Sequence, residues 1–124
     1  MSHKEIKVKI FLYLLVGALV LWTVMSFMRK GDKMSATAVK TKIDTGALIV
    51  DVRTAGEYAG GHYPNAINIP LDQVQARISE FGGDKNREIV VYCLSGGRSA
   101  SAKRILESAG YKNVTNAGGL GDMP

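Results

Sequence analysis

The stretch VVYCLSGGRSAS, from Val90 to Ser101, contains the only cysteine of the chain. The apolar run before Cys93 predicts a strand over 88–92. Two glycines follow the cysteine, and apolar residues at helical spacing then predict a helix over 99–109. This order places Cys93 at the carboxyl end of a strand, which is where open α/β sheets form their ligand site.

The segments on either side alternate between strand and helix patterns. Apolar runs predict a buried strand over 47–52, a short strand over 65–69 and a last short strand around Val114. Strands that alternate with helices indicate an α/β fold, with a small, mainly parallel sheet and helices on both faces.

Helices are predicted between these strands. Ser35 is a suitable N-cap for a helix that extends to about residue 43. Thr54 and Glu57 have the spacing of a capping box and predict a short helix. Apolar residues recur at helical spacing from Leu71 to Ile78 and predict another.

A different kind of segment precedes this domain. Residues 10–28 contain no charged residue, and as a helix they would extend about 28 Å, close to the thickness of a bilayer's hydrocarbon core. We expect one transmembrane helix over about 10–28, within an N-terminal segment and linker of residues 1–34, followed by a domain at 35–124. The alternative is a cleaved secretory signal, for which residues 36–38 would be the small-residue cleavage site. The apolar run exceeds the roughly 7 to 15 residues of a signal core, which favours the anchor.

The positive charge of the chain lies mostly beside the apolar segment. The net charge is +5, of which residues 1–34 contribute +4. The domain therefore lacks the basic cluster of a nucleic-acid interface, and we expect no nucleic-acid partner. Both flanks of the apolar segment are basic, so the charges do not determine its orientation.

Cys93 is expected to be reactive. Gly96 and Gly97 allow backbone turns that aim successive N–H groups inward, and the helix that follows adds its positive dipole end. Such surroundings lower a thiol's pKa from about 8.5. The alternative is a core cysteine that ends a strand, although a core thiol gives no reason for a Gly-Gly-Arg loop. A single cysteine forms no internal disulfide, and zinc-ligand spacings are missing from the sequence, so we expect no metal and no cofactor.

Two segments of the sequence resemble the rhodanese family of sulfurtransferases. These are DVRTAGEYAGGHYPNAINIP at 51–70 and VYCLSGGRSAS at 91–101, and the resemblance covers about residues 35–124. NIPLDQVQARI at 68–78 and the final YKNVTNAGGLGDMP are similar to the small single-domain phage-shock protein E type. The resemblance implies a thiosulfate sulfurtransferase, in which Cys93 accepts a sulfane sulfur as a persulfide. The donor would be thiosulfate or a persulfide, and the acceptor cyanide or a thiol, including a protein thiol.

The resemblance also implies the site residues. Cys93 corresponds to the nucleophile, the loop amides would hold the persulfide, and Arg98 would favour a small anionic donor. The expected substrate-binding residues are Leu94, Ser95, Gly96, Gly97, Arg98, Ser99 and Arg53. Because this chain lacks the first strand and the tryptophan of larger rhodaneses, we expect a shallow, exposed site.

Two other functions remain open. One is a non-catalytic rhodanese-fold module for binding or redox sensing. The other, less favoured, is a phosphatase or arsenate reductase. Phosphatase loops have one more residue between cysteine and arginine than the four that separate Cys93 from Arg98. The periplasmic location of phage-shock members implies a single-pass inner-membrane protein whose domain faces the periplasm.

Several polar residues near these motifs are expected to be structural. His62 is not needed as a base if the loop already ionises the thiol. Asp51 and Arg53 are expected to form a charge network with Glu57. Asn68 and Asn116 are interpreted as turn or loop residues.

Overall fold

The computed structural model describes residues 2–31 and 33–124, with the side chains of 27–31 excepted. Contacts divide the chain into two compact units, Met1–Asp32 and Lys33–Pro124. The predicted linker around 31–33 therefore lies partly outside the described residues, as do the side chains of Arg29 and Lys30.

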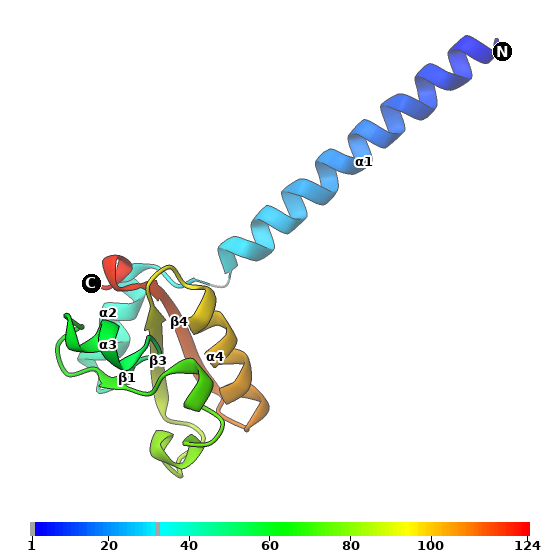
Figure 1. Cartoon of the computed structure of the whole chain (residues 1–124). Coiled ribbons are helices and arrows are strands. Elements are labelled where there is room, and N and C mark those ends of the chain that lie inside the picture. The colour runs from blue at the N-terminus through cyan, green and yellow to red at the C-terminus, as the bar shows by residue number, and fades with distance from the viewer. Residues whose placement is uncertain (1, 32) are drawn as a thin grey trace. The chain divides into compact units, whose positions relative to one another are not determined.

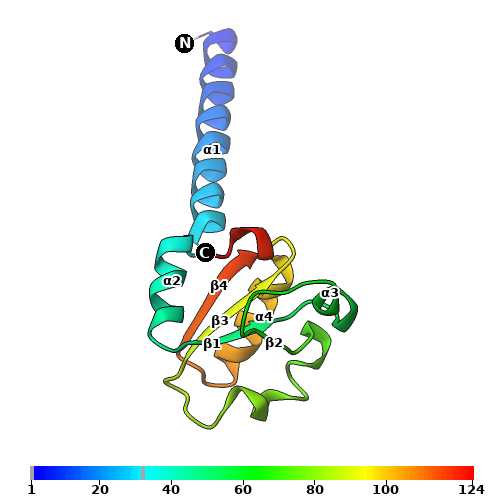
Figure 2. The same ribbon diagram turned by 90° about the vertical axis from the view of Figure 1, so that its left-hand side faces the viewer.

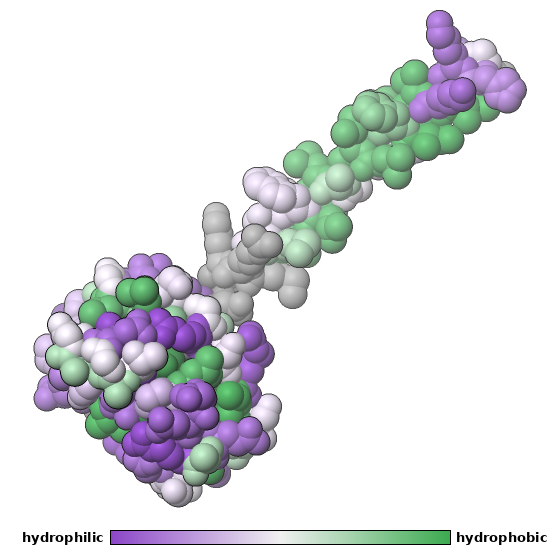
Figure 3. All heavy atoms as spheres, in the orientation of Figure 1, coloured by the Kyte–Doolittle hydropathy of each residue, from purple (hydrophilic) through white to green (hydrophobic). Residues whose placement is uncertain are grey.

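The first unit contains helix α1 (His3–Gly31). Among the described residues, His3–Ser26 is the helix that is long and apolar enough to cross a membrane, either as an anchor or as a signal sequence. Apolar residues extend along it, with hydrophilic residues at its N-terminal end (Figure 3). Its large apolar side chains between Ile6 and Met25 are exposed, as they would be in a helix that packs against lipid.

The second unit is built on a parallel sheet, as the alternating patterns predicted (Figure 2). Its strands are β1 (Leu48–Asp51), β2 (Ile67–Asn68), β3 (Glu88–Cys93) and β4 (Asn113–Gly119), in the order β2-β1-β3-β4. All three pairs of neighbours are parallel. The strand predicted around Val114 is longer than expected, with seven residues in β4. Asparagine and glycine have low strand propensity, but backbone pairing with β3 extends β4 through them.

Helices cover both faces of the sheet (Figure 1). Helix α2 (Ala36–Asp44) packs on one face, and α4 (Gly97–Ser108) packs on the other. Helix α3 (Ala55–Ala59) follows β1. The predicted Ser35 cap and the Thr54–Glu57 capping box are both confirmed.

Two predicted helices differ in the structure. The segment from Leu71 forms two 3₁₀ turns, Leu71–Gln73 and Ile78–Phe81, since the periods of 3₁₀ and α structure are hard to distinguish over so few residues. Helix α4 begins at Gly97 and not at Ser99. Gly96 caps it with a positive φ of 100°, a conformation that glycine adopts at little cost. Arg98 therefore lies in the first turn of α4.

The side chains of β3 alternate between two buried clusters. Ile89, Val91 and Cys93 pack with residues of α4 on one face. Val90 and Tyr92 pack with Val39 of α2 on the other. This alternation directs Cys93 toward the face that α4 covers.

Candidate active site

Cys93 ends β3, between β1 and β4 in the sheet. The register of β3 and β4 shifts between Val91 and Cys93, so that Cys93 lies opposite Gly119. Contrary to the expected exposed site, the exposed fraction of Cys93 is 0%. The neighbouring Leu94 is 62% exposed. The loop thus encloses its cysteine and presents an apolar side chain to solvent.

The Cys93 sulfur receives hydrogen bonds from the loop that follows it. The Gly96 amide donates to Sγ at 2.9 Å, and Ser99 Oγ lies 3.4 Å from Sγ. Burial raises the pKa of Cys93, but the Ser99 hydroxyl and the backbone amides of Ser99, Gly96 and Ser95 lower it by more, so that the pKa falls below its ordinary value. A thiolate held in this way can attack an electrophilic sulfur.

Asn116 of β4 forms hydrogen bonds with the loop after Cys93 and with the start of α4. Its Oδ1 lies 2.7 Å from Ser99 Oγ and accepts the Gly118 amide at 2.9 Å, while its Nδ2 donates to the Gly96 carbonyl at 3.3 Å. Asn116 is only 4% exposed, so its interpretation as a turn or loop residue is wrong. The sequence does contain a sign of this buried position. Asn116 follows Val114 by two residues, and alternate residues of a strand point to the same face of the sheet.

Two glycines at the end of β4 also contact the loop. A Cβ at Gly119 would lie 2.1 Å from the Leu94 carbonyl oxygen, and a Cβ at Gly96 would lie 3.4 Å from Gly118 Cα. The backbone of β4 thus approaches the loop at a distance that excludes a side chain at 119.

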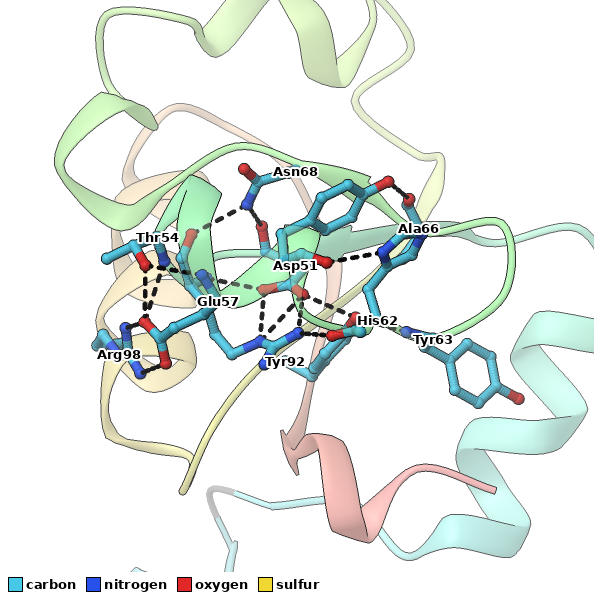
Figure 4. A network of polar contacts seen from close by, with 12 residues as sticks. Asp51, Thr54, Glu57, His62, Tyr63, Ala66, Asn68, Tyr92 and Arg98 are labelled. Carbon is cyan, nitrogen blue, oxygen red and sulfur yellow. Dashed lines mark hydrogen bonds and ion pairs between the residues drawn. The ribbon is translucent and has the colours of Figure 1, made fainter.

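Arg98 forms a bidentate ion pair with Glu57 (Figure 4). Its Nη1 lies 2.7 Å from Glu57 Oε1, and its Nη2 lies 3.0 Å from Oε2. Glu57 Oε1 also accepts hydrogen bonds from the amide and hydroxyl of Thr54 in the capping box of α3. These interactions, led by the bond to Arg98, lower the pKa of Glu57 to about 2. Whether Arg98 favours an anionic donor stays a prediction.

Glu57 should make the stability of the domain depend on pH at the acid end. Its ordinary pKa of 4.5 applies to the unfolded chain and its pKa of about 2 to the folded one, so its stabilising contribution is present above about pH 4.5. That contribution is lost as the pH falls through about 2. Chemical denaturation between these pH values should show a shallower loss of stability in Glu57→Gln than in the parent. Identical pH profiles would contradict the assignment.

Arg53 makes its polar contacts in a second cluster, with Asp51 and Gly61. Its Nη2 lies 2.7 Å from Asp51 Oδ2 and 2.7 Å from the Gly61 carbonyl oxygen. The Tyr92 hydroxyl donates to Asp51 at 2.9 Å, and burial is the main cause that raises the pKa of Tyr92 to about 12. The Asp51–Arg53 part of the predicted network is confirmed. The inclusion of Glu57 is wrong, because its carboxylate pairs with Arg98.

The structure therefore brings most of the predicted site residues together. In the described part of the chain, the Arg53 side chain bonds to Asp51 and the Gly61 carbonyl and lies over the Tyr92 ring, and no hydrogen bond joins it to the Cys93 loop. His62 stacks on Tyr58, with ring centroids 3.7 Å apart. Asn68 donates to the carbonyl oxygens of Asp51 and Arg53, so it ties β2 to the end of β1 and is not merely a turn residue.

A family model described as the rhodanese-like domain matches residues 35–120. The chain belongs to the rhodanese family. The resemblance read from its motifs and the α/β rhodanese fold are both confirmed.

Similar proteins agree with this placement. The thiosulfate sulfurtransferase PspE of Escherichia coli is 47% identical over 74 residues, which cover 60% of this rhodanese and 71% of PspE. A sulfurtransferase of Allochromatium vinosum is 42% identical over 72 residues, or 58% of this chain and 65% of the relative. The solved structure titled rhodanese with anions from E. coli has a TM-score of 0.60 at 46% identity, covering 64% of this chain and 95% of that chain.

Proposed function

We propose that this rhodanese is a sulfurtransferase that carries a sulfane sulfur as a persulfide on Cys93. The donor is thiosulfate or an organic persulfide, and the acceptor is cyanide or a thiol. The observation that carries the proposal is the hydrogen bonding of the Cys93 sulfur by Ser99 and the loop amides, which favours the thiolate. The similarity to PspE, which is named a thiosulfate sulfurtransferase, supports it.

In the first half-reaction, the Cys93 thiolate attacks the sulfane sulfur of thiosulfate. A sulfur–sulfur bond forms, the original sulfur–sulfur bond breaks, and its electron pair leaves with sulfite. In the second half-reaction, cyanide or a thiolate attacks the outer sulfur of the persulfide, and the Cys93 thiolate is the leaving group. Backbone amides such as that of Gly96 would stabilise negative charge on either sulfur.

The proposed site consists of Cys93 and the residues that surround its sulfur. Ser99 and the amides of Ser95 and Gly96 would hold the persulfide, and Gly97 begins the helix behind them. Leu94 would contact donor or acceptor at the exposed side of the loop. The proposed site also includes two arginines that do not bond to the sulfur. Arg98 pairs with Glu57, and Arg53 pairs with Asp51 at the end of β1.

One observation favours a second function. Because the exposed fraction of Cys93 is 0%, the loop must open or shift before a donor reaches the sulfur. A binding module that does not use the thiol would not need that opening.

Mass spectrometry distinguishes the two functions. Reduced protein is mixed with thiosulfate or with an organic persulfide, and then with cyanide. An enzyme gains the mass of one sulfur atom on Cys93 and loses it to cyanide over many cycles. Failure of both donors to add sulfur would reject the sulfurtransferase and leave the binding module.

We further propose that residues 1–34 form a membrane segment and linker that tether the domain of residues 35–124 to the inner membrane, facing the periplasm. The apolar helix α1 and the similarity to PspE support this proposal. A membrane anchor would keep the protein in the membrane fraction, whereas a cleaved signal would release the domain.

Topology can be measured with an exposed thiol, because Cys93 itself is buried. In Cys93→Ser combined with Ser108→Cys, the new thiol lies at an exposed position at the end of α4. A membrane-impermeant maleimide should label it in intact spheroplasts. The Cys93→Ser variant without the second change is the control, and labelling that appears only after lysis would reverse the topology.

A further inference from the structure

Both terminal nitrogens of the Arg98 guanidinium are bonded to Glu57, at 2.7 and 3.0 Å. The two side chains are 35% and 30% exposed, so solvent screens the pair only in part. Thr54 holds the same carboxylate through two further hydrogen bonds, which keep it oriented. The positive charge of Arg98, in the first turn of α4, is thus offset by a positioned negative charge.

Arg98 also lines a groove of about 370 Å³ beside the loop. The groove contains a second carboxylate, that of Asp72. Arg98 is thus paired with one carboxylate, that of Glu57, and the carboxylate of Asp72 lines the same groove. The remaining lining residues are mostly apolar: Val52, Thr54, Pro70 and Leu71.

We propose that Glu57 is a specificity-determining residue that disfavours dianionic sulfur donors, so that an organic persulfide is preferred over thiosulfate. The inference rests on the proposed sulfurtransferase function. A dianion near Arg98 would have to displace Glu57 or lie close to its carboxylate, in a groove that Asp72 also lines, and either arrangement weakens its binding. A persulfide of low charge avoids this repulsion, and its organic part can lie against Val52 and Leu71 in the groove.

The chemical step with an organic persulfide balances without another reactant. The Cys93 thiolate attacks the terminal sulfur of R–S–SH and forms a new sulfur–sulfur bond. The bond between the two donor sulfurs breaks, and its electron pair leaves with the thiolate R–S⁻. The proton remains on the transferred sulfur or passes to solvent.

Glu57→Gln tests the inference. Glutamine at this position of a capping box still accepts the Thr54 amide, so α3 retains its cap while the charge is removed. The ratio of kcat/KM for thiosulfate to that for 2-hydroxyethyl persulfide should rise about three- to tenfold, mostly through a lower KM for thiosulfate. Glu57→Asp keeps the charge and should stay close to the parent ratio.

Glu80→Gln is the matched control, since it removes another exposed glutamate–arginine ion pair, that with Arg77, and neither residue lines the groove. Its ratio should equal that of the parent. A fall of the ratio in Glu57→Gln, or an equal change for both donors, would show that Glu57 only positions Arg98 and would overturn the inference.

The salt dependence of the unmodified chain gives a second test that needs no variant. Screening weakens repulsion between thiosulfate and the two carboxylates, so the ratio should rise with ionic strength. A ratio that falls with salt would mean net attraction of the dianion and would overturn the inference. If neither donor adds sulfur to Cys93, the proposed function itself fails, which is a separate outcome.

Discussion

Replacing Cys93 with serine should abolish persulfide formation and leave the fold nearly intact. Cys93 is the only thiol of the chain, and a serine hydroxyl is not ionised near neutral pH, so no nucleophile of comparable strength remains at the end of β3. The Gly96 amide can donate to the serine oxygen as it does to Sγ, so the free energy of unfolding should change by only about 1 kcal/mol.

Mass spectrometry after incubation with thiosulfate or an organic persulfide measures this loss, and thermal denaturation measures the stability. Ser101→Ala is the matched control, because Ser101 lies on α4 and, among the described residues, its hydroxyl bonds to the Gly97 carbonyl and Arg104 and not to the Cys93 sulfur. It should take up sulfur as the parent does. Uptake of one sulfur by Cys93→Ser would reject Cys93 as the carrier.

Gly119→Ala should disable the catalytic loop although residue 119 is not in it. Gly119 has φ −94° and ψ 170°, which any residue adopts, so the effect would be steric and not conformational. The new methyl group would lie 2.1 Å from the Leu94 carbonyl oxygen, which forces β4 and the loop apart. A shift of this size at reacting groups lowers kcat/KM by about 100-fold or more, and overpacking costs about 1 to 3 kcal/mol of stability.

Gly121→Ala is the control for this substitution, because a Cβ at Gly121 would have no neighbour within 4 Å. It should leave sulfur transfer and stability close to those of the parent. Sulfur transfer at the parent rate by a folded Gly119→Ala would show that the loop adapts, and that the close approach of β4 does not position it.

The local elements around Cys93 could be predicted because they depend on neighbours in the sequence. The apolar run of β3, the glycines after the cysteine and the apolar spacing of α4 indicate a strand, a loop and a helix. The capping box of Thr54 and Glu57 is a contact over three residues, so its spacing was sufficient to predict it. The long apolar run of α1 was likewise visible in the sequence.

The partners of these residues could not be predicted, because they come from distant segments. Glu57 and Arg98 are 41 residues apart, and Ser99 and Asn116 are 17 apart. Their contact depends on strand order and on the register of β3 with β4, which local patterns do not encode.

The residues alone indicate an apolar N-terminal helix and an α/β rhodanese domain whose one thiol lies at a strand end. Backbone propensity, periodicity and the family motifs carry that information locally. Three features become visible only in the folded chain: Cys93 is buried, Glu57 offsets the charge of Arg98, and β4 lies against the loop. Burial and pairing result from packing the sheet between its helices, since that packing sets which side chains meet across the fold.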